Sequence, residues 1–313
     1  MSRLLVVGLA TSLDRYAWLP QTRLGAINRP REILVQAGGK GLNAARAAAG
    51  LGVRVRSVSL VGGETGRTVR ALAGELDVRF VDSGAETRQC LCLLDDAGVL
   101  TEVYEPVPPV PPTVWPVLRD VLAGEITALE PGDLVAVSGR VPPGLPVDAL
   151  AQIVDLAAAR KVAVVVDSDG PALIEAVRRG PALVKVNAHE AAAATHGAAD
   201  PLAALRSMGA HAVVVTDGSS GARYLGDDGT RLAVTHEPIA GALPVGSGDA
   251  FLAGFAAHRL RGTAVDVAES LRVAAAAARA NARHLPAGDI SWEAVNAELP
   301  QVHVEPGPTG TCV

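Results

Sequence analysis

Residues 147–195 read VDALAQIVDLAAARKVAVVVDSDGPALIEAVRRGPALVKVNAHEAAAAT, and this stretch alternates two kinds of segment. Helical patterns over Val147–Arg160 and Ala188–Thr195 flank two short apolar runs, Val162–Asp167 and Leu183–Val186. Runs that are apolar at nearly every position are typical of strands buried on both faces of a parallel sheet. The stretch therefore predicts an α/β fold with helices covering both faces of the sheet.

The same alternation continues toward both ends of the chain. Further strands are predicted at Leu4–Leu9, Val53–Val61, Leu134–Ser138 and Ala212–Thr216. Further helices are predicted at Leu42–Leu51 and Pro201–Met208, with two long ones over about Asp249–Arg261 and Thr263–Arg283. Ala274–Ala278 in the last helix is nearly polyalanine, which suits tight packing against a neighbour. We expect one doubly wound domain over residues 1–313, with a mostly parallel sheet.

Two regions, about 15–36 and 88–105, break this alternation because no helix separates their short strands. The predicted strands there are Glu32–Gln36, Arg88–Leu94 and Val99–Tyr104, and a turn at 95–98 joins the last two. We interpret them as a small separate sheet that forms a lid. The proline-rich residues 106–112 lead back to the main domain, and residues 299–313 are expected to form a flexible tail.

Composition and charge exclude several classes of protein. The 313 residues are 49% hydrophobic and 19% charged, as in ordinary soluble proteins. The net charge of −5 argues against nucleic-acid binding, and few aromatic side chains are present to stack on bases. The apolar run Leu4–Ala10 is too short for a signal peptide or a membrane span. We therefore expect a cytoplasmic protein with no nucleic-acid or membrane partner.

The three cysteines favour no metal site. Cys90 and Cys92 form a C-x-C pair without the second pair that a zinc site needs, and Cys312 lies near the C-terminus. We expect reduced thiols, as in a cytosolic protein.

The segment Pro244-Val245-Gly246-Ser247-Gly248-Asp249-Ala250-Phe251 carries the first candidate chemistry. Its glycines lie just before a predicted helix, where free backbone N–H groups can bind a phosphate. Asp249 in the first turn can accept a proton from a hydroxyl. The alternative is an ordinary loop in which Asp249 caps the helix.

A second glycine-rich loop reads Ala37-Gly38-Gly39-Lys40-Gly41-Leu42-Asn43-Ala44-Ala45-Arg46. Asn43 and the backbone can hold hydroxyl groups, and Lys40 can meet an anion. The loop is not a Walker A motif, because Gly41 follows Lys40. The alternative is a glycine turn with a solvated lysine.

Two further segments are weaker signals. In Lys185-Val186-Asn187-Ala188-His189-Glu190, the residues Asn187 and Glu190 share one helix face and can hold a hydrated Mg²⁺, or they form a simple capping box. The segment Thr216–Ala222, with glycines at 218 and 221, is by itself only a strand–turn–strand.

The order of these four motifs resembles the PfkB (ribokinase-like) carbohydrate kinases over about residues 4–290. Within the family the chain is most similar to the branch of 1-phosphofructokinases and tagatose-6-phosphate kinases. The residues that carry the branch resemblance are Ser12-Leu13-Asp14-Arg15, Ile27-Asn28-Arg29, Gly38–Arg46, Thr87-Arg88, Leu100-Thr101-Glu102 and Ser138–Gly144. The resemblance implies a ribokinase-like fold with a β-sheet lid, ATP and Mg²⁺ as cofactors, and a homodimer formed through the lid.

The resemblance also implies roles for particular residues. Asp249 matches the catalytic base, and Gly246, Ser247 and Gly248 match the anion hole. The residues that match sugar contacts are Asp14, Gly38, Gly39 and Asn43, and those that match contacts to a phosphate on the sugar are Arg88, Arg29 and Lys40. The residues that match nucleotide contacts are Lys185, Asn187, Thr216, Gly218, Gly221 and Asn281. Glu190, with Asn187, matches the Mg²⁺ site.

The implied reaction is ATP-dependent phosphorylation of a sugar phosphate, first of all fructose 1-phosphate to fructose 1,6-bisphosphate. Tagatose 6-phosphate and fructose 6-phosphate remain open as substrates, because the chain departs from the branch near the sugar. Cys90 stands where the branch often has Asn, and Ala10-Thr11-Ser12 stands where the branch has Asn-Pro-Ala. Val186 also replaces a family proline.

Three other functions fit the residues less well. A kinase for an unphosphorylated sugar or a nucleoside has no need of the cationic residues Arg88, Arg29 and Lys40. A dinucleotide-dependent reductase needs a glycine fingerprint after the first strand, which residues 8–13 lack. A non-catalytic sugar sensor has no need to retain Asp249 and Glu190.

Overall fold

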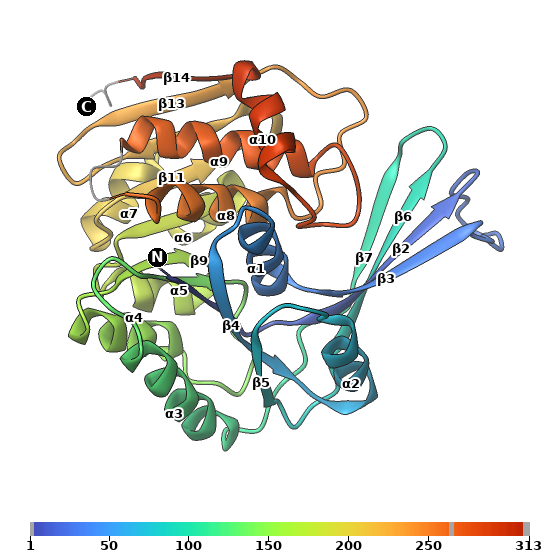
Figure 1. Cartoon of the computed structure of the whole chain (residues 1–313), viewed down its shortest axis with the longest axis horizontal. Coiled ribbons are helices and arrows are strands. Elements are labelled where there is room, and N and C mark those ends of the chain that lie inside the picture. The colour runs from blue at the N-terminus through green and yellow to red at the C-terminus, as the bar shows by residue number, and fades with distance from the viewer. Residues whose placement is uncertain (1–2, 263–265, 309–313) are drawn as a thin grey trace.

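The structure is a computed structural model, and it describes residues 3–262 and 266–308. Its main sheet has ten strands in the order β14-β13-β12-β11-β10-β9-β8-β1-β4-β5 (Figure 1). Neighbours from β5 across to β11 are parallel, and β11 to β14 are antiparallel. The strands are β1 Arg3–Gly8, β4 Arg54–Val61, β5 Val78–Asp82, β8 Leu134–Ser138, β9 Ala163–Asp167, β10 Leu183–Asn187, β11 Val213–Thr216, β12 Ala222–Leu225, β13 Arg231–His236 and β14 Val302–Pro306.

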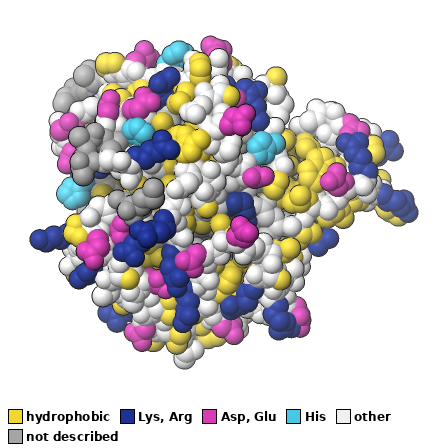
Figure 2. Space-filling model, viewed as in Figure 1, with side chains coloured by type: hydrophobic (Ala, Val, Ile, Leu, Met, Phe, Trp, Pro, Cys, Tyr) yellow, Lys and Arg dark blue, Asp and Glu magenta, His cyan; other side chains and the backbone are white. Residues whose placement is uncertain are grey.

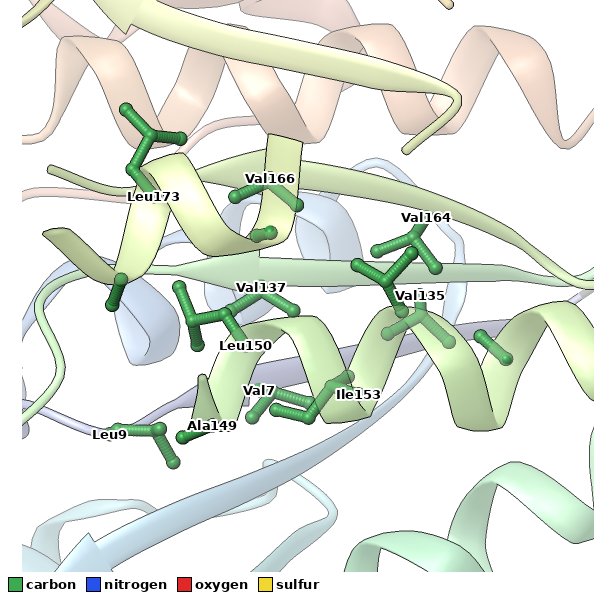
Figure 3. Close-up of a cluster of buried hydrophobic side chains, with 14 of the residues drawn as sticks. Val7, Leu9, Val135, Val137, Ala149, Leu150, Ile153, Val164, Val166 and Leu173 are labelled. Atoms are coloured by element: carbon green, nitrogen blue, oxygen red, sulfur yellow. The ribbon is translucent and has the colours of Figure 1, made fainter. Parts of the chain in front are cut away.

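Helices cover both faces of this sheet, because its strands are apolar on both sides. One face carries α1 Lys40–Gly50, α8 Ser247–Arg259, α9 Val267–Asn281 and α10 Trp292–Glu298. The other carries α3 Val114–Thr127, α4 Ala149–Ala159, α5 Gly170–Val177, α6 Ala188–Ala194 and α7 Pro201–Met208. Figure 3 shows the second layer, where Leu150 and Ile153 of α4 lie against Val7 and Val137 of the sheet.

The alanine-rich helix packs as tightly as its composition predicts. A Cβ added to Gly254 of α8 would lie 2.7 Å from the Cβ of Ala277 in α9 and 2.9 Å from the carbonyl oxygen of Val273. Small side chains on both helices therefore let the two backbones approach closely.

A second, four-stranded sheet projects from the main body, and we call it the lid sheet (Figure 1). Its strands are β2 Ser12–Leu19, β3 Glu32–Gly38, β6 Arg88–Asp95 and β7 Leu100–Tyr104, in the order β3-β2-β6-β7. The helix α2 Gly63–Leu72 packs at its base, through Val69 against Leu13 and Ala37. The predicted α/β fold with a mostly parallel sheet and a small second sheet is confirmed.

The structure corrects two predicted boundaries. Residues 299–306 are not a flexible tail: a 3₁₀ turn at Leu299–Gln301 leads into β14, which pairs with β13. The apolar Val302 is buried against the α9 layer, a signal that the nearby prolines and glycines obscured. The last long helix begins at Val267 because the Asp266 carboxylate caps its N-terminus through the Ala268 N–H. Residues 263–265 and 309–313 of those predictions lie outside the described residues.

Among the helices that the structure describes, none is long and apolar enough to cross a membrane.

Candidate active site

The carboxyl ends of the central strands place the candidate residues together. β1 lies between β4 and β8, and the chain builds the sheet outward from it in both directions. Such a reversal of strand order opens a crevice at the carboxyl ends of the strands, where α/β proteins bind ligands. Gly8, Ser138, Asp167 and Asn187 end β1, β8, β9 and β10 at this edge.

A network of paired charges occupies this edge. The carboxylate of Asp167, which is fully buried, accepts hydrogen bonds from Lys185 Nζ at 2.6 Å and Lys40 Nζ at 3.2 Å. Lys40 also pairs with Glu190 at 3.1 Å. Burial alone would raise the pKa of Asp167, but the two ammonium groups outweigh it and hold that pKa below its ordinary value. We call Lys40, Asp167, Lys185 and Glu190 the charge network.

Asp249 lies beside this network in the first turn of α8. Its side chain is only 4% exposed, and its Oδ2 accepts a hydrogen bond of 3.1 Å from Asn43 Nδ2. Burial and the nearby Asp167 carboxylate raise the pKa of Asp249 to about 7, against the opposing effect of Lys40 and Lys185. A carboxyl group with a pKa near neutrality is suited to accept a proton from a hydroxyl.

The N-cap and first residues of α8 offer groups that attract an anion. Gly246 has a φ of 76°, and a Cβ on it would lie 2.5 Å from the Ala287 Cβ. A Cβ on Gly248 would lie 3.4 Å from Lys185 Nζ, so the ammonium group sits close to the start of the helix. Backbone N–H groups at a helix N-terminus and an adjacent ammonium group both attract phosphate. We call Gly246–Gly248 the anion loop.

Asp14 on β2 lies on the side of the crevice that the lid sheet borders. Its carboxylate is buried and accepts a 2.6 Å hydrogen bond from the Ser12 hydroxyl. A Cβ on Gly38 would lie 2.0 Å from Asp14 Oδ2, so any larger residue would displace this carboxylate. Burial raises the pKa of Asp14, and hydrogen bonds from Ser12 and the Gly39 N–H oppose that rise. Asp14 and the first glycine loop are therefore brought together as the resemblance predicted.

Four buried atoms near this side have no hydrogen-bond partner among the described residues. They are Thr11 Oγ1, Gln36 Oε1, Arg88 Nε and Ser138 Oγ, and we call them the unpaired set. Arg88 nevertheless donates from its other nitrogens to the carbonyls of Glu105 at 3.2 Å and Ala10 at 3.5 Å. Buried polar atoms are nearly always paired in proteins, so these four can accept or donate hydrogen bonds to a polar ligand or to water.

Asn187 and Glu190 form the capping box that their spacing allows. Asn187 Oδ1 accepts from the Glu190 N–H at 2.8 Å, and Glu190 Oε2 accepts from the Asn187 N–H at 2.9 Å. Both side chains also border a pocket of about 610 Å³. The described residues contain no group of three acidic, histidine or cysteine side chains that could hold a metal. A Mg²⁺ here fits as an ion that keeps most of its ligands as waters and phosphate oxygens.

Several predicted site residues have other surroundings than expected. The Lys40 ammonium belongs to the charge network rather than standing free for a substrate phosphate, and Lys185 is likewise paired. Asn281 is a correction: its amide is fully buried and donates to Val245 O at 2.7 Å and accepts from the Gly288 N–H at 2.8 Å. It therefore braces the anion loop instead of presenting its side chain to an adenine.

Within one chain, Arg29 does not lie at the candidate active site. It is exposed on the loop between β2 and β3, at the far end of the lid sheet (Figure 1). Of the predicted nucleotide contacts, Thr216 ends β11 next to Asn187, its partner in register. Gly218 and Gly221 bound the turn that follows, and both have positive φ.

Sequence reasoning missed two residues of the site. Asp167 ends a run of valines at the carboxyl edge of the sheet, where an acidic residue is a usable signal. Arg46 donates to the Ala37 carbonyl at 2.6 Å and to Asn43 Oδ1 at 3.4 Å, so it holds the first glycine loop. No pattern in the sequence distinguishes Arg46 from a solvated helix residue.

Comparison with known structures places this geometry among sugar kinases. Phosphofructokinase-2 from Escherichia coli, in complex with potassium, matches with a TM-score of 0.83 and 25% identity, over 96% of this chain and 99% of that one. The same enzyme in complex with fructose-6-phosphate matches at 0.82 with the same identity and coverage. A possible 1-phosphofructokinase from Thermotoga maritima has a TM-score of 0.87 at 22% identity, over 98% of this chain and 100% of that one, and supports the fold.

The family comparison agrees. The sequence profile described as pfkB family carbohydrate kinase matches residues 1–294. These residues include the anion loop, the charge network and the whole lid sheet. The chain belongs to the pfkB family of carbohydrate kinases.

Proposed function

We propose that this kinase transfers the γ-phosphoryl group of ATP to a sugar phosphate. Fructose 1-phosphate, giving fructose 1,6-bisphosphate, is the first candidate substrate, followed by fructose 6-phosphate and tagatose 6-phosphate. The similarity to phosphofructokinase-2, 25% identical and solved with fructose-6-phosphate, supports a sugar that already carries a phosphate.

The observation that carries this proposal is the guanidinium of Arg88. It lies at the base of the lid sheet, where Ser12 is its partner in register, and it is close enough to Asp14 to oppose the rise that burial causes in the pKa of that carboxyl group. Its Nε belongs to the unpaired set. A guanidinium with an unused donor in a buried setting suits a phosphate oxygen, while Asp14 next to it suits a sugar hydroxyl.

The chemistry follows from the other end of the crevice. Asp249 accepts the proton of the attacking hydroxyl as its oxygen bonds to the γ-phosphorus, and ADP leaves with the bridging oxygen. The anion loop and Lys185 stabilise the negative charge of the transferring group. Mg²⁺, held through Glu190 and Asn187, would neutralise charge on the nucleotide phosphates.

We also propose that the lid sheet forms a homodimer. The face of this sheet that is turned away from Asp14 carries Ile33, Leu91, Leu93 and Val103, and Ile33 and Val103 are 47% and 54% exposed. Figure 2 shows hydrophobic side chains spread over the lid and basic ones at its far end. An apolar sheet face of this kind is typical of an interface. Sedimentation of the protein with and without an Ile33→Asp/Val103→Asp change tests it, since only the unchanged chain should sediment as a dimer.

A coupled assay of ADP release tests the reaction. Fructose 1-phosphate, fructose 6-phosphate, tagatose 6-phosphate, ribose and nucleosides are each offered with MgATP. We expect the highest kcat/KM with a sugar phosphate. Equal or better use of ribose or a nucleoside would refute the sugar-phosphate assignment and leave the unphosphorylated class.

A further inference from the structure

The lid sheet is fastened to the loop Leu285–Gly288, which connects α9 and α10. Gln36 Nε2 on β3 donates to the Ala287 carbonyl at 3.0 Å, and the Ala287 N–H donates to Tyr16 Oη on β2 at 3.3 Å. Two lid strands thus hold both backbone groups of Ala287, and Arg46 of α1 also donates to its carbonyl at 3.4 Å. Tyr16 and Ala287 are fully buried in a small apolar cluster that also contains Cys92 and Val245.

The same loop holds the anion loop from its other side. The Gly288 N–H donates to Asn281 Oδ1 at 2.8 Å, and Asn281 Nδ2 donates to Val245 O at 2.7 Å and to Ser247 Oγ at 3.3 Å. A Cβ on Gly246 would overlap the Ala287 Cβ at 2.5 Å. Ala287 therefore packs closely against Gly246, and a shift of Ala287 toward the anion loop would displace Gly246.

We propose that Tyr16 and Gln36 are positioning residues for phosphoryl transfer, acting through Ala287 and Asn281 on the anion loop. Asp14 lies on β2 with Tyr16, and Gly38 lies on β3 with Gln36. A sugar that binds against Asp14 and Gly38 therefore also fixes the position of the two strands that hold Ala287. Sugar occupancy is thereby transmitted to the donors that stabilise the transferring phosphoryl group, which is a coupling between two sites. This inference rests on the proposed function for its kinetic consequence, but the contact chain is a property of the protein alone.

Hydrogen–deuterium exchange on the ligand-free full-length protein tests the contact chain. Gln36→Met keeps the side-chain length and removes the amide, and Tyr16→Phe removes only the hydroxyl. Each should raise amide exchange in residues 244–250 by roughly 2- to 10-fold, the equivalent of losing one hydrogen bond. The matched controls are Gln89→Met, on the opposite face of the lid sheet, and Tyr104→Phe on β7, and both should leave residues 244–250 unchanged.

Unchanged exchange in both test variants would overturn the inference, and so would an equal rise in the controls, which would indicate general loosening. In the kinetic arm, Gln36→Met should lower kcat for the sugar phosphate by roughly 2- to 10-fold, with the KM for ATP nearly constant, and Gln89→Met should not. If no sugar supports turnover in the wild-type protein, the proposed function fails, while the exchange data still decide the contact chain.

Discussion

Two polar regions face the same crevice, and they differ in whether their partners are present. In the charge network, the buried Asp167 is satisfied by Lys185 and Lys40 before any ligand arrives. In the unpaired set, the Arg88 guanidinium and the Gln36 amide each retain a buried atom without a partner in the described structure. Paired charges are suited to a chemistry that is the same for every substrate, whereas hydrogen-bonding groups without a partner are suited to selecting among substrates.

The energetic reasons for the two arrangements also differ. Buried ions are costly unless they are paired, so the network needs all its members to be stable. An unpaired buried polar atom costs about 1–3 kcal/mol, which a ligand recovers on binding. Substitutions in the two regions should therefore have different effects. Changes at the charge network should lower catalysis with every substrate. Changes at the unpaired set should affect one substrate more than another.

The largest effect is expected at Asp249. Asp249→Asn keeps the shape and the Asn43 contact but removes the proton acceptor, so turnover should fall by roughly 10²- to 10⁴-fold with nucleotide affinity largely kept. Steady-state kinetics and titration with ADP measure both quantities. Near-wild-type turnover would remove Asp249 from the mechanism.

The same variant has an independent signature in stability. The folded pKa of Asp249, about 7, lies above its unfolded value, so the folded protein loses stability as pH rises toward 7 and bears the full cost above it. Asp249→Asn should therefore have a higher melting temperature than the wild type at pH 8. The difference should shrink at pH 5, where the wild-type carboxyl is protonated.

The next largest effect should separate substrates. Arg88→Ala should cost about 2–5 kcal/mol in kcat/KM for the sugar phosphate and far less for the matching unphosphorylated sugar, with the KM for ATP nearly constant. Arg88→Lys should rescue little, because an ammonium group cannot copy the paired guanidinium bonds. Arg79→Ala, at an exposed arginine of β5, is the control. Equal losses with both sugars would show that Arg88 is not the phosphate anchor.

A smaller effect concerns the pH at which activity appears. Asp249 must be ionised to act as a base, so kcat/KM should fall about tenfold per pH unit below about 7. Asp167→Asn removes a negative neighbour and should move this limb to lower pH, while Lys185→Met removes a positive one and should move it to higher pH. If the acidic limb of the kcat/KM profile stays at the same pH in both variants, the group that titrates there is not Asp249.

The smallest effect is expected at Glu190. Glu190→Gln can keep the capping box but loses the charge that pairs with Lys40 and that would attract Mg²⁺. The Mg²⁺ concentration for half-maximal activity should rise, and the KM for the sugar should change little. A variant that loses about 1 kcal/mol of stability and keeps its Mg²⁺ dependence would limit Glu190 to a helix cap.

The order of strands, helices and glycine loops was readable in the sequence because each rests on a local pattern. Valine runs marked the central strands, and the Gly-x-Gly before Asp249 marked a helix start that approaches a phosphate. Other elements were missed, namely α2, α3, α5, α10, β5, β13 and β14. Of these, α2 and β5 carry mixed patterns, and β14 is a short strand among prolines and glycines. Their positions depend on the neighbours that cover them.

The fold class, the two glycine loops and the candidate Asp249 were readable from the sequence, because backbone conformation and residue chemistry are local properties. Asp14 and Arg88 were candidates through the family resemblance alone. Which charges pair depends on the three-dimensional structure. Lys40 joins Asp167 across 127 positions of sequence, and Asn281 turned from a nucleotide contact into a brace for the anion loop. The pKa of Asp249 was likewise decided there, since burial and the distances to Asp167, Lys40 and Lys185 exist only once the strands stand side by side.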